Sequence, residues 1–155
     1  MIRKSKCCCL LAVGLGLLLA LNTAVAAAPT AKMTKEVVDY YYTGQKEGPV
    51  LTEAKLCKGV QKFECTETIN PDSVTKGQTI NVWMQFFVPK GASYDDILVE
   101  YKHEGVPRRL TPHKIESSIR YRLVDKNSVD KTGNWTITVK KGITQLKEFK
   151  IKVVK

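Results

Sequence analysis

Four arginines are the residues best suited to bind a charged ligand. They are Arg108, Arg109, Arg120 and Arg122. Arg120 and Arg122 share one face of a strand, because side chains two positions apart point the same way. If the strand before it pairs with this one as a hairpin, all four guanidinium groups gather on an outer face, where their forks suit carboxylate, sulfate or phosphate. The alternative is a solvated face whose arginines form ion pairs with Glu100, Glu104 or Glu116.

Side chains typical of catalysis occur, but in arrangements that do not support it. The two histidines, His103 and His113, belong to no nucleophile elbow and no His-Glu-x-x-His motif. Asp95 and Asp96 are adjacent, and neighbouring residues of a strand point to opposite faces. No glycine-rich phosphate loop joins a strand to a helix. We therefore expect a protein that is not an enzyme and that needs no cofactor.

The N-terminus has the order of a secretory signal peptide. Basic residues at positions 3, 4 and 6 precede an apolar run over 10–21, and Ala24-Val25-Ala26 fits the cleavage rule. The run has 12 residues, which is shorter than the ~20 that a spanning helix needs. We expect 1–26 to be removed, leaving an exported chain without a transmembrane span, in the periplasm, the cell envelope or outside the cell.

Two cysteines remain after that cleavage, Cys57 and Cys65. An even number of cysteines in an exported chain predicts a disulfide, and the seven residues between these two suit a bridge across a hairpin. Two thiols without a histidine at ligand spacing do not make a zinc site, so no metal site is expected.

The net charge of the chain restricts which partners are expected. The signal segment holds three of the 25 basic residues and none of the 15 acidic ones, so the remaining 129 residues carry a net charge of +7. Such a chain is attracted to anionic surfaces, so an envelope protein or an anionic polymer is an expected partner. Nucleic acid is not, because the chain is exported. A purely solubilising role for the lysines stays open, since they are spread along the chain.

Residues 27–49 and 50–155 differ in their patterns. In the first segment Thr34 can cap a helix and Gly44 can stop it, which predicts a helix over 34–43 and then a linker. A helix of about ten residues is marginal in water, so it must dock on the domain or on a partner.

From residue 50 onward the apolar residues recur with a period of two. Strands are predicted near 50–57, 60–68, 78–88, 96–102, 106–110, 117–124, 134–140 and 144–154. Turn residues such as Pro89-Lys90-Gly91 separate them. The pattern predicts an all-β fold, an Ig-like antiparallel two-sheet β-sandwich. Trp135 belongs to its core, while Trp83 and Phe87 point away from the core and need a neighbouring strand or the helix to cover them.

The predicted domain resembles a bacterial envelope module, the domain of unknown function 2914 family. Three blocks carry the resemblance: 50–60 with its Gly-Val, the aromatic strand 77–87, and 132–139 with its Thr-Gly-x-Trp. The resemblance covers about 50–154 and departs at 99–103, where the family has Trp-Tyr. It implies an Ig-like fold and no activity.

Two functions are compatible with these features. The first is an exported, non-enzymatic Ig-like domain that binds a protein or an anionic envelope polymer through the four arginines. The second is a structural or assembly subunit of a cell-surface machine or filament, docked through the 34–43 helix.

The signal peptide is tested by processing. The exported protein should begin at or within a few residues of Ala27, because the small residues of the cleavage rule precede it. Intact mass spectrometry of the exported protein measures this. A mass that still includes Met1 to Ala26 would show that no signal peptide is removed.

Overall fold

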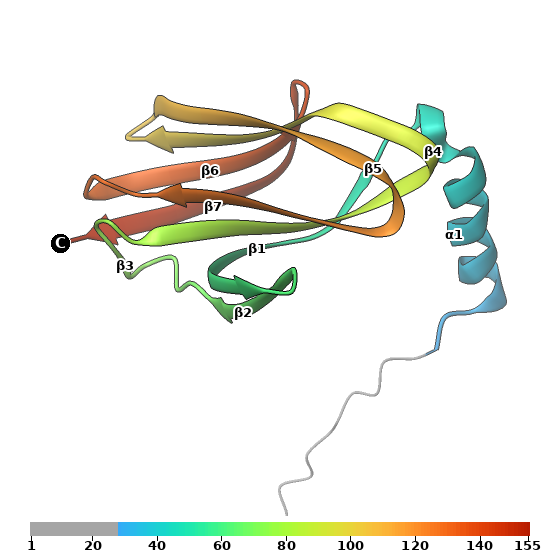
Figure 1. Cartoon of the computed structure of the whole chain (residues 1–155), viewed down its shortest axis with the longest axis horizontal. Helices are drawn as coiled ribbons and strands as arrows, with labels where there is room; N and C mark the ends of the chain where they lie inside the picture. The colour runs from blue at the N-terminus through green and yellow to red at the C-terminus, as the bar shows by residue number, and fades with distance from the viewer. Residues whose placement is uncertain (1–27) are drawn as a thin grey trace, which may run out of the picture.

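The computed structural model describes residues 28–155, so the predicted signal peptide at 1–26 lies outside the described residues (Figure 1). Helix α1 (Ala31–Thr43) and a short 3-10 helix, η1 (Gly44–Lys46), precede the strands. The strands are β1 (Val50–Gln61), β2 (Glu64–Thr68), β3 (Val74–Thr75), β4 (Thr79–His103), β5 (Val106–Ser128), β6 (Gly133–Lys141) and β7 (Thr144–Val154). Within this part of the chain no helix is long and apolar enough to cross a bilayer.

Helix α1 begins one turn earlier than predicted and ends at the predicted glycine. Thr30 is the N-cap, because its extended backbone lets its hydroxyl accept a hydrogen bond from the Met33 amide. The side chain of Thr34 instead donates to the Thr30 carbonyl. The helix docks on the domain: the rings of Tyr40 and Tyr41 lie 5.6 and 5.8 Å from the ring of Phe87.

The strands form one mixed sheet rather than two separate ones. Its order is β2-β1-β4-β6-β7-β3, and β5 also pairs with β4. Residues 79–88 of β4 pair with β1 and with the second half of β5, whereas 93–103 pair with β6 and the first half of β5. The sheet therefore curls into a half-barrel (Figure 1). The predicted two-sheet sandwich is not confirmed, and β3 pairs with β7 in parallel, which the all-antiparallel prediction did not include.

The segments predicted as separate strands 78–88 and 96–102 are parts of β4. Pro89-Lys90-Gly91 does not end the strand, because the chain stays extended through it with a shift of register between Val88 and Ser93. Gly91 accommodates this shift of register, because its φ of 73° lies in the left-handed region that favours glycine. In the same way β5 contains both 106–110 and 117–124. Turn residues here bend long strands instead of separating short ones.

The core lies on the inner side of the curl. Both halves of β4 contribute to it, with Val82, Met84 and Phe86 from the first half and Val99 and Tyr101 from the second. Trp135 of β6 is 2% exposed, as predicted. Its indole Nε1 donates to the Lys131 carbonyl at 2.9 Å, so the ring is buried without leaving its polar atom unpaired.

A buried carboxylate joins the two halves of the curl. Asp125, in the second half of β5, accepts hydrogen bonds from the Tyr101 hydroxyl at 2.5 Å and from His113 Nε2 at 3.0 Å. The guanidinium of Arg109 lies 3.8 Å away. Burial alone would raise the pKa of Asp125, but these hydrogen bonds and the charge of Arg109 outweigh it and hold the pKa below its usual range. Burial raises the pKa of Tyr101, which stays a donor.

The carboxylate should therefore stabilise the fold in a pH-dependent way. Asp125→Asn should lower the free energy of unfolding at pH 7 by about 2–3 kcal/mol, since hydrogen bonds to a charged group contribute about 1.5–3 kcal/mol each. A lowered pKa in the folded state means that this contribution is present above the unfolded value of about 3.9 and is lost as the pH falls through the folded value. Urea unfolding at several pH values measures it.

The difference in the free energy of unfolding between wild type and Asp125→Asn should thus become smaller below about pH 4. Tyr101→Phe is the control, because it keeps the buried ring and removes one hydrogen bond to the carboxylate. A difference that does not change with pH would contradict a charged Asp125.

Candidate functional site

The β1–β2 hairpin has a strained turn. Its two central residues, Lys62 and Phe63, have φ angles of 49° and 59°, and Gln61 pairs with Glu64 across them. This is the type I′ geometry of two-residue hairpins, for which Asn-Gly is the usual sequence. A lysine and a phenylalanine in this region of backbone space cost roughly 1–2 kcal/mol each.

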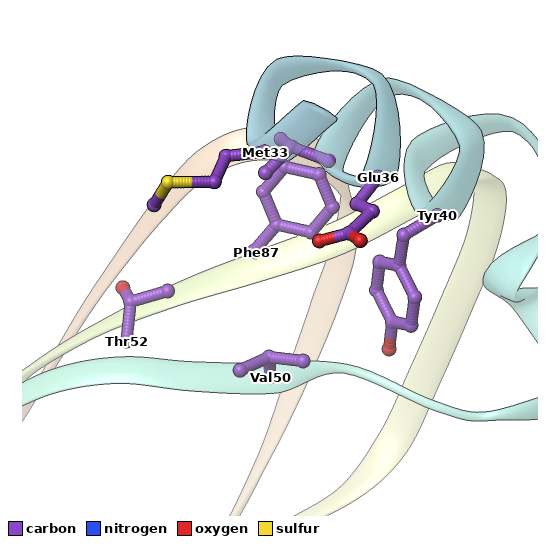
Figure 2. Close-up of a pocket in the computed structure, with 7 residues that line it drawn as sticks. Met33, Glu36, Tyr40, Val50, Thr52 and Phe87 are labelled. Atoms are coloured by element: carbon purple, nitrogen blue, oxygen red, sulfur yellow. The ribbon is translucent and has the colours of Figure 1, made fainter. Parts of the chain in front are cut away.

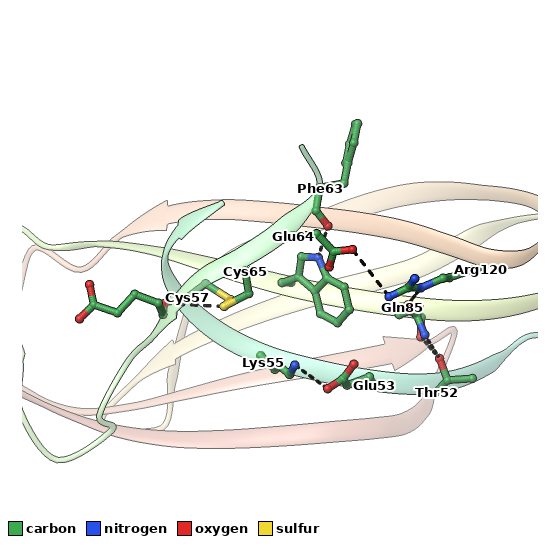
Figure 3. A network of polar contacts seen from close by, with 11 residues as sticks. Thr52, Glu53, Lys55, Cys57, Phe63, Glu64, Cys65, Gln85 and Arg120 are labelled. Carbon is green, nitrogen blue, oxygen red and sulfur yellow. Dashed lines mark hydrogen bonds and ion pairs between the residues drawn. A yellow bond between two sulfur atoms is a disulfide. The ribbon is translucent and has the colours of Figure 1, made fainter. Parts of the chain in front are cut away.

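Bonds on both sides of the turn hold it in place. The predicted disulfide between Cys57 and Cys65 is present and joins β1 to β2. The indole Nε1 of Trp83 donates to the Phe63 carbonyl at 2.6 Å (Figure 3). The backbone of Phe63 is therefore fixed from the sheet below, while its side chain is 63% exposed.

The covers predicted for Trp83 and Phe87 are both present, on the outer face of the sheet. The β1–β2 hairpin covers Trp83, which is buried on the side away from the core, and Lys55 Nζ lies 5.4 Å from its ring. Helix α1 covers Phe87 through Tyr40 and Tyr41.

Two of the predicted arginines lie beside the exposed phenylalanine. Arg120, Arg122 and Phe63 line a shallow hollow of about 410 Å³. Arg122 binds the carboxylate of Glu64 at 2.5 Å, and Arg120 lies 3.7 Å from the same carboxylate. Among residues 28–155, the buried Nε of Arg122 has no hydrogen-bond partner.

A polar ladder crosses the sheet next to this hollow. The Nε of Arg120 donates to the side-chain oxygen of Gln85, and the Gln85 amide donates to Thr52 Oγ1 at 3.1 Å. These contacts link β5, β4 and β1 (Figure 3). They orient the guanidinium of Arg120 while leaving its side chain 57% exposed.

The other two predicted arginines form a second group. Arg109 donates to the Lys126 carbonyl at 2.8 Å and to Asn127 Oδ1 at 3.0 Å. Arg108 and Arg109 line a different hollow, next to Trp135. The structure thus brings Arg120 and Arg122 together and separates them from Arg108 and Arg109, so the single patch is divided. Binding by either pair stays a prediction.

The sequence suggested three glutamates as ion-pair partners of the arginines, and in the structure all three bind other residues. Glu100 binds Lys140 at 2.5 Å, and this hydrogen bond holds the pKa of Glu100 below its usual range against the opposing effect of burial. Glu104 accepts the Asn134 amide, and Glu116 pairs with Lys114.

Sequence reasoning missed Phe63 and Glu64 as members of the site. Residues 60–68 contain no glycine, asparagine or proline to mark a turn, so they read as one strand. The one available signal is the disulfide, because a bridge between Cys57 and Cys65 requires the chain to reverse between them.

A third hollow lies between α1 and β1. It measures about 390 Å³ and is mostly apolar, with Met33 and Val37 on the helix side and Val50 and Phe87 on the sheet side (Figure 2). Tyr40 closes one end, where its hydroxyl donates to the Gly48 carbonyl. Within the described chain, no group of three or more histidine, cysteine, aspartate or glutamate side chains is placed to hold a metal ion.

Comparison with known proteins identifies the fold and not a family. No family model matches the chain, so the resemblance to the domain of unknown function 2914 family is not confirmed, and no curated protein matches it. An immunoglobulin-like protein from Pseudomonas aeruginosa superposes with a TM-score of 0.52 at 13% identity, covering 68% of this chain and 96% of that one.

Two further solved structures are more distant. The alkylpurine DNA glycosylase AlkC of Pseudomonas fluorescens has a TM-score of 0.46 at 10% identity, with 70% of this chain and 31% of that chain covered. The CARDB domain of a Pyrococcus furiosus protein has a TM-score of 0.39 at 15% identity, with 69% of this chain and 96% of that chain covered. The curled, mostly β sheet of this chain is similar to the immunoglobulin-like protein of Pseudomonas aeruginosa, and at 13% identity the likeness concerns the fold alone.

Proposed function

We propose that this chain is an exported, non-enzymatic binding domain that captures a carboxylate-bearing segment of another protein against Phe63, Arg120 and Arg122. One observation carries the proposal: an aromatic side chain is held in water by a turn whose backbone is strained. Strained residues persist where the surrounding structure over-determines them, and such positions cluster at functional sites.

The strain at Phe63 has no evident benefit for the fold. The bond from Trp83 reaches the carbonyl of residue 63, which any residue would supply. The ring of Phe63 adds little packing, because most of it is exposed. Glycine would make the same turn without strain. The ring is therefore best explained by a contact outside the chain.

The charges around the ring define the ligand. Arg120 and Arg122 line the hollow and share one carboxylate partner, Glu64, so the hollow is net positive. Arginine forks bind carboxylates with two parallel hydrogen bonds. The loose 3.7 Å contact between Arg120 and Glu64 leaves the Arg120 fork available to a carboxylate of the partner. Arginines and aromatic residues are also the commonest energetic anchors of protein interfaces.

The exposed ring favours a protein over an anionic polymer. A polyanion would use the guanidinium groups but would gain little from an exposed benzene ring. A protein segment can place an apolar side chain on Phe63 and an acidic one on Arg120. Export to the envelope or beyond is supported by the signal-peptide pattern and by the disulfide, since disulfides persist in oxidising compartments.

The alternative proposal is a structural or assembly subunit. Its support is helix α1, which docks on the sheet and still exposes apolar side chains to water. The two proposals use different surfaces, so they can be tested separately.

Site-specific photo-crosslinking tests the binding function. A photoreactive phenylalanine analogue at position 63 should give a discrete crosslinked protein in intact cells, and Arg120→Glu should abolish it by reversing the charge beside the ring. The same analogue at Ile143, a fully exposed residue in the β6–β7 turn, is the matched control. Equal crosslinking at positions 63 and 143, or no crosslinking at position 63, would contradict the proposal. Crosslinks to glycan or other polymer would assign the site to a polyanion.

The strained turn also predicts a conflict between stability and binding. Phe63→Gly should raise the free energy of unfolding by about 1 kcal/mol, because glycine relieves the positive φ and loses some of that gain to its greater flexibility when unfolded. The same substitution should abolish capture of the crosslinked partner. Lys62→Gly is the control, since it relieves similar strain and keeps the ring. Urea unfolding and a pulldown measure the two effects, and a Phe63→Gly variant that loses stability or still captures the partner would contradict the prediction.

A further inference from the structure

The sheet has two open edges. β1 pairs with β4 along most of its length, but it pairs with β2 only from Cys57 onward. β7 pairs with β6 along its length, but it pairs with β3 only at Val153 and Val154. In the part of the chain that the structure describes, the outer edge of β1 over 50–55 and that of β7 over 144–151 therefore have no strand partner.

These two edges face each other across a hollow of about 380 Å³. Residues 54–56 of β1 form one side, 147–150 of β7 form the other, and the chain around Ile69 lies at one end. The core is incomplete along this side, because Ala54 and Phe149 pack against it and stay partly exposed. The hollow therefore has room for apolar side chains from outside the chain.

The chain itself shows how such a gap is filled. At one end of the hollow, the Ile69 amide donates to the Leu56 carbonyl of β1 at 2.8 Å. The Lys152 amide of β7 donates to the Pro71 carbonyl, also at 2.8 Å. Segment 69–71 thus bonds to both edges, so the gap there is one strand wide. The same two strands continue past this segment as the sides of the hollow.

The backbone of β7 can accept a strand at this edge. Successive residues of a strand point their N–H and C=O groups alternately to its two sides. Because the Lys152 amide faces segment 69–71, the amides of Lys150 and Glu148 face the same side. Within residues 28–155 neither of these two amides has a hydrogen-bond partner, so both can bond to a chain placed beside them.

The charge of β7 selects the kind of chain. The strand holds Lys147, Lys150 and Lys152 against one carboxylate, Glu148, which lies 3.4 Å from Lys150. Lys147 has no ion-pair partner in the described range, and its Nζ lies 5.6 Å from the ring of Phe149. An acidic strand is attracted to such an edge. A second copy of this chain is not, since two β7 edges side by side would bring lysines together, and like charges on neighbouring strands are destabilising.

We infer that an extended, acidic segment of another protein adds to β7 as a strand, in the gap between β7 and β1. Its backbone bonds to Glu148 and Lys150. Its apolar side chains complete the core beside Ala54 and Phe149, and its carboxylates meet the lysines of β7. In strand addition of this kind, backbone bonds supply affinity and the pockets for alternate side chains supply specificity. The surface shares no residue with the hollow beside Phe63, so the inference does not rest on the proposed function.

Amide hydrogen exchange with two synthetic peptides tests the inference on the chain without residues 1–26. One peptide of about eight residues, within the length of an ordinary strand, alternates valine with glutamate, and the other alternates valine with lysine. The glutamate peptide should slow exchange of the Glu148 and Lys150 amides by about tenfold or more, because a bonded amide exchanges only when the added strand leaves. The lysine peptide should leave both amides unchanged, and the effect of the glutamate peptide should fall as salt is added.

A charge-reversed variant tests the role of the lysines. Lys147→Glu with Lys150→Glu should weaken binding of the glutamate peptide by about tenfold or more, because like charges then meet at the edge. Lys32→Glu with Lys35→Glu is the matched control, because it changes the net charge equally but on α1. The control variant should bind the glutamate peptide as wild type does.

A second pair of variants tests the backbone bonds. Glu148→Pro removes an amide that faces the gap and should abolish the slowed exchange at Lys150. Proline is tolerated at an outward position of an edge strand, and Glu148→Ala, which keeps the amide, should keep binding. Unchanged exchange at Glu148 and Lys150 with about 1 mM glutamate peptide overturns the inference, as does equal slowing by the lysine peptide. Exchange that slows without peptide as the protein concentration rises would overturn it too, by assigning the edge to a second copy.

Discussion

The pairing of β4 with β5 continues past the bend at 88–93, and the other strands take their places from it. β1 adds to the first half of β4 and β6 to the second, so both halves of the curl share one hydrogen-bonded ladder. β5 pairs with β4 alone, so it forms an edge of this ladder. Asp125 joins the two halves there, because its buried carboxylate in one half receives hydrogen bonds from Tyr101 and His113 in the other. The carboxylate stays charged in the core because its donors outweigh the penalty of burial.

With the core on the inner side, the outer face of the first half needs its own covers. Trp83 lies under the β1–β2 hairpin and Phe87 under α1. Each cover buries one aromatic ring and exposes other apolar groups, Phe63 in one case and Val38 and Tyr42 of α1 in the other. The exposed surfaces of the β1–β2 hairpin and of α1 thus have one cause. The first half of β4 has bulky residues on both of its faces, so both faces must be covered.

Much of the fold could be predicted from residue patterns. The strands near 134–140 and 144–154, the docked helix and the disulfide follow from alternation, capping and cysteine number. The continuity of β4 could not be predicted, because Pro89-Lys90-Gly91 has the composition of a turn and only the sheet on either side keeps it extended. Two residues of the candidate site were predicted, because Arg120 and Arg122 share a face of their strand, as alternation requires. Their separation from Arg109 depends on the curl, and a strained Lys-Phe turn has no compositional signal.

The short parallel pairing of β3 with β7 has a consequence for the timing of folding. Val74 and Thr75 pair with Val153 and Val154, the most distant strand partners in residues 28–155. Contacts between segments far apart in the chain form slowly, because a long loop must close first. That edge of the sheet can close only when residue 153 is available, so a nascent chain keeps this edge open while the earlier strands are already made.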